Sequence, residues 1–195
     1  MVEHPMAIQP DVYVSSQEYL AFEKQAVHKS EYIAGTIVAM SGASRKHNLI
    51  VTNIVTSLVQ QLRGRPCEVY ASDMRVKMPA SDLYVYPDVV VVCGTPQFED
   101  SDLDTLLNPT LVIEVLLQST EFRDRGVKAQ GYRLRDSLAE YLLIAQDGCR
   151  IEQYIRQADN QWLLVDFHVL EETANLVSIH CTLSIQDVYD RVLLA

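Results

Sequence analysis

The chain has 195 residues, of which 48% are hydrophobic and 22% are charged, a composition typical of a soluble globular protein. Its formal net charge of −10 argues against a broad, nonspecific nucleic-acid-binding surface, although not against a local basic cleft. No apolar run approaches the roughly 20 residues that cross a bilayer, and the N-terminus lacks the blocks of a signal peptide. The four cysteines show no metal-binding spacing, so we expect reduced thiols in a cytoplasmic protein.

The N-terminal part of the chain predicts a short helix, a β-hairpin and a long helix. Ser15 or Ser16 can cap the short helix, and the hairpin EYIAGTIVAM begins at Glu31. The later segment SRKHNLIVTNIVTSLVQQLR has apolar residues at helical spacing and carries His47 in its first turns. We therefore expect the start of the long helix to direct His47 toward the neighbouring sheet.

Several short β segments follow the long helix. Residues 67–71 and 73–78 predict two strands, and in the second one Met and Val alternate with Arg and Lys. DLYVYPDVVVVC predicts a further strand with an edge, a bulge or a bend at Pro87, because proline lacks the N–H of a central strand. A polar loop leads to LVIEVLLQST, a strand whose composition predicts burial on both faces.

The C-terminal half predicts a helix, four strands and a closing helix. EFRDRGVKAQGYRLRDS is the first helix, on which Asp124, Lys128 and Tyr132 share one stripe. The strands are AEYLLIAQD, CRIEQYIRQ, QWLLVDFHVL and ETANLVSIH, and the closing helix is SIQDVYDRVL. This order of elements indicates a single α/β domain, in which helices flank a mixed β-sheet.

Two carboxylates, Asp88 and Glu114, lie inside apolar strands. A carboxylate in such a place is costly to desolvate unless a neighbouring group neutralises it. If the two strands are neighbours, both side chains can reach one cation. Mg²⁺ suits such a site because it binds one or two carboxylates and keeps water and phosphate oxygens as its other ligands. The alternative is that an arginine or a backbone N–H satisfies each carboxylate separately.

The order of these motifs resembles the PD-(D/E)XK nuclease superfamily, and more narrowly a restriction endonuclease family once catalogued as a domain of unknown function. The resemblance covers Ser15 to Ile185. Its matching residues are Glu31, His47, Asn53, Asp73, Tyr86-Pro87-Asp88, Ile113-Glu114-Val115, Ser119-Thr120, Asp124, Lys128, Tyr132 and Glu140-Tyr141. It implies a restriction-endonuclease-like fold in residues 15–195, after an N-terminal tail of residues 1–14.

The resemblance also implies an enzyme, a metal-dependent endonuclease that hydrolyses DNA phosphodiester bonds. Asp88 and Glu114 would bind Mg²⁺ or Mn²⁺, and Lys128 would help to orient and activate the attacking water. Glu31 is either a further acidic group of the site or a solvated glutamate at the hairpin edge. His47 either contacts phosphate and carries a proton or is a hydrogen-bonded structural histidine. Asp73 is either a third ligand or a turn residue.

Three of the residues that follow Glu114, namely Leu116, Leu117 and Gln118, depart from the family pattern. The superfamily lysine lies two residues after the second acid, where this chain has Leu116, so the resemblance implies that Lys128 takes its place. Leu117 and Gln118 stand where family members have Ser and Pro. These departures leave a second hypothesis, a catalytically degenerate relative that acts as an oligomeric binding or regulatory module.

Two further features concern partners. The chain has one local basic cluster around the predicted Lys128 helix, made of Arg123, Arg125, Arg133 and Arg135. This cluster is either a place for a phosphate backbone or a solvated helix face. Apolar edges of the C-terminal strands could pair two chains into a homodimer, which would suit duplex cleavage, and no membrane partner is expected.

Overall fold

A central six-stranded mixed sheet organises the computed structural model, which describes residues 13–40, 42–78, 80, 82–99 and 101–194. The strand order is β11-β10-β9-β8-β6-β3. The strands are β3 (Cys67–Ala71), β6 (Val89–Cys93), β8 (Leu111–Leu116), β9 (Glu140–Ala145), β10 (Ile151–Arg156) and β11 (Trp162–Phe167). β8 and β9 are parallel, whereas the other neighbours pair antiparallel. Most of the predicted tail, residues 1–14, lies outside the described residues.

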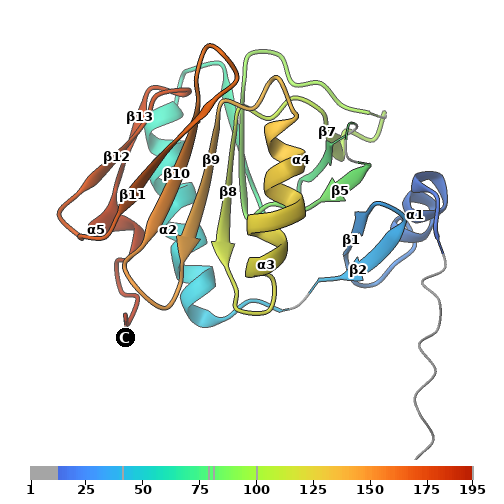
Figure 1. The fold of residues 1–195 in the computed structure, drawn as a ribbon, viewed down its shortest axis with the longest axis horizontal. Helices are drawn as coiled ribbons and strands as arrows, with labels where there is room; N and C mark the ends of the chain where they lie inside the picture. Colours follow the sequence, from blue (N-terminus) through green and yellow to red (C-terminus); the bar gives the residue numbers. More distant parts are fainter. Residues whose placement is uncertain (1–12, 41, 79, 81, 100, 195) are drawn as a thin grey trace, which may run out of the picture.

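A second sheet, which the sequence did not predict as separate, has the strand order β2-β1-β5-β4-β7. Its strands are β1 (Ser30–Ile33), β2 (Thr36–Ala39), β4 (Arg75–Met78), β5 (Leu83–Val85) and β7 (Thr105–Leu106). The predicted long strand therefore breaks at Pro87, as the missing N–H suggested, and its halves join different sheets. Figure 1 shows the hairpin β1–β2 and helix α1 (Ser16–Glu23) at one side of the large sheet.

Helix α2 (Arg45–Leu62) covers one face of the large sheet (Figure 1). The Ser44 hydroxyl caps it by accepting a hydrogen bond from the His47 N–H at 3.1 Å. On β8, Ile113 and Val115 pack in the core shared with α2, whereas Val112 and Leu116 belong to the core on the opposite face. Because side chains alternate along a strand, Glu114 shares the face of Val112 and Leu116.

The helix predicted after β8 forms as three short segments. They are α3 (Glu121–Arg123), the π-helical turn η2 (Asp124–Lys128) and α4 (Ala129–Arg133). They cover the sheet face opposite α2 (Figure 1). No helix in the described ranges is long and apolar enough to span a membrane.

The C-terminal part differs from the prediction in two places. The segment expected as one strand is β12 (Thr173–Leu176), and it forms a hairpin with β13 (Cys181–Ser184). The closing helix α5 (Ile185–Val188) starts after the expected cap, Ser184, but ends after about one turn.

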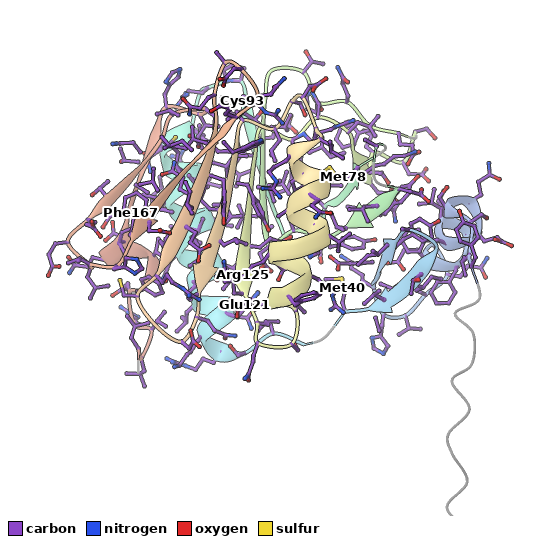
Figure 2. All side chains as sticks on the ribbon, viewed as in Figure 1. Met40, Met78, Cys93, Glu121, Arg125 and Phe167 are labelled. Atoms are coloured by element: carbon purple, nitrogen blue, oxygen red, sulfur yellow. A yellow bond between two sulfur atoms is a disulfide. The ribbon has the colours of Figure 1, made fainter. Side chains whose placement is uncertain are left out.

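The expectation that all cysteines are reduced is wrong for Cys67 and Cys93, which form a disulfide with an S–S distance of 1.98 Å. The two residues face each other in the β3–β6 register, a pairing that their separation in the sequence does not reveal. Cys149 and Cys181 are free thiols. Figure 2 places Cys93 at the end of the sheet opposite Glu121, away from the site described below.

Candidate active site

A pocket of about 220 Å³ lies between the two sheets, α2 and the segments α3 and η2. The five residues predicted for the site all line it: Glu31, His47, Asp88, Glu114 and Lys128. Met40, on the segment after β2, also lines the pocket, and Figure 2 shows it next to the helical segment that carries Glu121 and Arg125. The structure thus gathers the five predicted side chains from five separate segments of the chain.

The register of β6 and β8 places the two strand carboxylates side by side. Val89 pairs with Ile113, so one further antiparallel step sets Asp88 opposite Glu114. The Val115 N–H donates a hydrogen bond to Oδ2 of Asp88 at 2.7 Å, which ties this carboxylate to β8. The condition that the two strands are neighbours is therefore met, although Asp88 lies immediately before β6 and not inside it.

Lys128 is the centre of a buried ion cluster. Its Nζ lies 2.8 Å from Oε1 of Glu31, 3.0 Å from Oδ1 of Asp124 and 3.2 Å from Oε1 of Glu114. The exposed fraction of each of these four residues is 5% or less. The hydroxyl of Tyr132 donates a hydrogen bond to Oε1 of Glu114 at 2.8 Å. The predicted stripe therefore faces Glu114, although η2 replaces a regular α-helical turn within it.

The charges of this cluster do not balance. Burial raises the pKa of the Glu114 carboxyl well above its ordinary value, and Lys128 opposes that shift. The negative charges of Asp124, Asp88 and Glu31 raise the pKa further. Because four carboxylates share one ammonium, the site favours uptake of a proton or of another cation.

His47 contacts Asp88 from the first turn of α2. Its Nε2 lies 3.1 Å from Oδ1 of Asp88, and its exposed fraction is 6%. Nδ1 is buried and has no hydrogen-bond partner among the described residues. The structural interpretation of this histidine therefore accounts for one ring nitrogen only, and the other is left for a ligand.

Two sequence candidates lie elsewhere. The side chain of Asp73 is 83% exposed and forms an ion pair with Lys29, so this residue belongs to a turn outside the pocket. Arg125 is engaged by Glu121 at 2.7 Å and by Glu152. Of the four clustered arginines, only Arg123 lines the pocket.

Sequence reasoning underestimated two residues that hold the site together. It placed Asp124 only on the same helical stripe as Lys128, but Asp124 also accepts a hydrogen bond from the Thr120 hydroxyl at 3.0 Å. It gave Tyr132 no role besides packing, whereas its hydroxyl binds Glu114. The helical spacing of the stripe was the available signal, since it places both residues on the face of Lys128.

The donor set suits a hard divalent cation. Asp88 and Glu114 offer carboxylate oxygens, and the described contacts of Glu114 all use Oε1. Within the described part of the chain, no three His, Cys, Asp or Glu residues are arranged as a complete metal site. A cation held by this pair would take its other ligands from water or substrate, as Mg²⁺ does in phosphate-transferring enzymes.

Comparisons with known proteins agree with this picture. A family model described as "Uma2: Putative restriction endonuclease" matches residues 16–186. The uncharacterized protein sll1609 of Synechocystis sp. is 38% identical over 161 residues, which are 83% of this chain and 91% of the relative. The uncharacterized protein slr1290 of the same organism is 33% identical over 176 residues, 90% of this chain and 91% of the relative.

A solved structure shares the fold. It is described as a putative nuclease from Anabaena variabilis, and it superposes with a TM-score of 0.75 at 18% sequence identity. The match covers 92% of this chain and 99% of that chain. The mixed α/β architecture is therefore restriction-endonuclease-like, as the sequence predicted.

Proposed function

Because the chain belongs to the Uma2 family of putative restriction endonucleases, we propose that it is a metal-dependent endonuclease that hydrolyses DNA phosphodiester bonds. The observation that carries this proposal is the meeting of Asp88, Glu114 and Lys128 in one pocket. Two acids can hold a divalent cation that assists phosphodiester hydrolysis, and a nearby ammonium can stabilise the negative charge that develops on the phosphate.

Asp88 and Glu114 would hold Mg²⁺ or Mn²⁺. The excess of carboxylates over ammonium groups supports this assignment, because a cation would offset the repulsion that raises the pKa of Glu114. When bound, such a cation stabilises negative charge on phosphate oxygens and lowers the pKa of a coordinated water.

Lys128 provides the ammonium that the superfamily lysine would otherwise supply. Leu116 occupies the superfamily position and is buried in the core, but the Nζ of Lys128 still lies 3.2 Å from Glu114. Glu31, on β1, also holds this ammonium at 2.8 Å. Lys128 would thus stabilise, through its charge, the negative charge that develops on the phosphate, and it would orient the attacking water through an N–H that it now shares with Glu114.

His47 would assist at the side of Asp88. Its Nε2 is held by that carboxylate, whereas Nδ1 has no partner among the described residues. Because Nε2 faces a carboxylate, it carries the ring N–H, and Nδ1 of the neutral ring is an acceptor. We infer that Nδ1 accepts a proton at the pocket, and that the protonated ring can then donate a hydrogen bond to a phosphate oxygen.

The proposal is tested by cleavage of supercoiled plasmid, linear duplex, single-stranded DNA and RNA, with Mg²⁺, with Mn²⁺ and with a chelator. We expect DNA cleavage only with a divalent cation, and its loss in Asp88→Ala and Glu114→Ala. Asp166→Asn, which changes an exposed carboxylate on β11, is the matched control. Undiminished cleavage by both alanine variants would refute the assignment of Asp88 and Glu114 to the active site.

The degenerate-relative hypothesis keeps one supporting observation, the substitution of Leu117 and Gln118 beside Glu114. It predicts no cation-stimulated hydrolysis and no change of melting temperature with Mn²⁺. The expected homodimer stays a prediction, to be measured by light scattering. Leu163 and Leu164 on the edge strand β11 are 50% and 45% exposed, and they are the surface where such pairing would occur.

A further inference from the structure

The cations of the pocket are not equally available to a substrate. Lys128 is enclosed by three carboxylates at 2.8–3.2 Å. His47 is in contact with Asp88. A phosphodiester is an anion, so besides a cation on Asp88 and Glu114, a positive side chain that the four carboxylates do not already occupy would favour its approach to the pocket.

Arg123 is such a group. It lines the pocket, and it makes no ion pair or side-chain hydrogen bond with any residue that the structure describes. Its Nε is buried without a hydrogen-bond partner. A buried N–H without a partner destabilises the folded protein, so its presence in a pocket points to a ligand that accepts the hydrogen bond.

The neighbouring arginines show that this state is particular to Arg123. Arg125, two residues later, is bound by Glu121 and Glu152. Arg133 is exposed, and its Nε donates to the Ala129 carbonyl within α4. The sequence presents these residues as one basic cluster, but in the structure only Arg123 has both access to the pocket and a buried N–H without an acceptor.

The backbone fixes the place of Arg123. It is the last residue of α3, and its N–H donates to the Thr120 carbonyl at 2.8 Å. The next residue, Asp124, belongs to the ion cluster around Lys128. Arg123 therefore belongs to a segment that is anchored on both sides, and it lines the same pocket as the groups proposed to carry out hydrolysis.

We propose that Arg123 binds a non-bridging phosphate oxygen of the nucleic-acid strand in the pocket, through its Nε and a terminal nitrogen. This inference rests on the proposed function. The planar guanidinium donates two parallel hydrogen bonds to a phosphate, and it keeps its charge throughout the physiological pH range. Arg123 is then a substrate-binding residue, which offsets the repulsion between the phosphate and the acidic pocket.

The test measures binding of a fluorescently labelled DNA duplex by anisotropy over a range of salt concentrations, with Ca²⁺ as the divalent cation and gels to verify intact DNA. We expect Arg123→Gln to raise the Kd by roughly 10-fold or more. The slope of log Kd against the logarithm of the salt concentration should decrease by about one unit, the contribution of one phosphate contact. Arg123→Lys should keep the slope but bind DNA more weakly than the wild type, because an ammonium cannot donate the two parallel hydrogen bonds of a guanidinium. Arg133→Gln should match the wild type.

Thermal stability separates phosphate binding from a structural role for Arg123. A structural role predicts that Arg123→Gln melts at a lower temperature than the wild type. Because the side chain has no partner in the described protein, Arg123→Gln should melt at the same temperature as the wild type or higher. Equal Kd and salt slope for the wild type and Arg123→Gln would overturn the inference, as would an equal loss in Arg133→Gln.

Failure of this inference is distinguishable from failure of the proposed function. If cleavage requires Asp88 and Glu114 while Arg123→Gln binds DNA normally, the nuclease function is supported and the phosphate contact of Arg123 is refuted. If Arg123→Gln weakens binding but no divalent cation supports cleavage, the contact stands and the nuclease falls. If the wild type binds no DNA, both fall.

Discussion

Replacement of Lys128 by methionine tests the buried ion cluster most sharply. Lys128→Met keeps most of the side-chain volume but leaves Glu31, Asp124 and Glu114 without the ammonium that lies 2.8–3.2 Å from them. Removal of one partner from a buried ion pair typically costs about 3–5 kcal/mol. At roughly 2–4 °C per kcal/mol for a chain of this size, we expect the melting temperature to fall by about 6–20 °C at neutral pH.

The pKa of Lys128 determines how the stability difference between the wild type and Lys128→Met changes with pH. Burial lowers the pKa of Lys128, but the carboxylates outweigh burial and raise it well above 10.5. The wild type therefore keeps this stabilisation below pH 10.5 and loses it as the pH rises through the folded-state pKa. In Lys128→Met the already raised pKa of Glu114 rises further, because Lys128 no longer opposes the effect of burial, and the penalty grows as the pH increases above the ordinary glutamate value of 4.5.

The assay is thermal and urea denaturation of both proteins from pH 4 to pH 8 in a chelator. Lys46→Met is the matched control, because Lys46 is a half-buried lysine without an ion pair among the described residues. The deficit of Lys128→Met should be largest at pH 8 and smallest at pH 4. Equal stability of this variant and the wild type at neutral pH, or a deficit that grows on acidification, would refute the reasoning.

Three further predictions follow from the same structure. Glu114→Gln should raise the melting temperature above pH 4.5 in a chelator, because it removes a carboxylate whose pKa is raised by burial and by like charges; a lower temperature would contradict this. Tyr132→Phe should cost about 1 kcal/mol in urea denaturation, since it deletes the 2.8 Å hydrogen bond to Glu114 but keeps the ring; an unchanged midpoint would show that this bond contributes nothing. Thiol titration of the unreduced, denatured protein should find two reactive thiols, Cys149 and Cys181; four would exclude the disulfide.

The sequence alone points to the site residues whose local sequence context is unusual, such as a carboxylate that would be costly to bury in an apolar strand. Asp88 and Glu114 interrupt apolar strands, so the expense of burying them is apparent before any fold is known. The site role of Lys128 follows from the family resemblance, and helical spacing adds only that Lys128 shares a stripe with Asp124 and Tyr132. His47 follows from its place at the start of a long, clearly amphipathic helix.

The remaining features depend on contacts between distant segments. The break at Pro87 is local, but nothing local indicates that β5 then joins a second sheet. The disulfide of Cys67 and Cys93 depends on the β3–β6 register. Arg123 and Arg125 look alike in the sequence, but Glu121 and Glu152 on β10 bind Arg125, whereas Arg123 lines the pocket.

The central claim is that Asp88 and Glu114 share a divalent cation, and anomalous diffraction from crystals soaked in Mn²⁺ tests it most directly. We predict a Mn²⁺ peak within about 2.0–2.6 Å of a carboxylate oxygen of each residue, the range of divalent cation–oxygen bonds. The peak should be absent from crystals of Asp88→Asn. A Mn²⁺ peak that contacts neither carboxylate, or one at this position that persists in Asp88→Asn, would contradict the account.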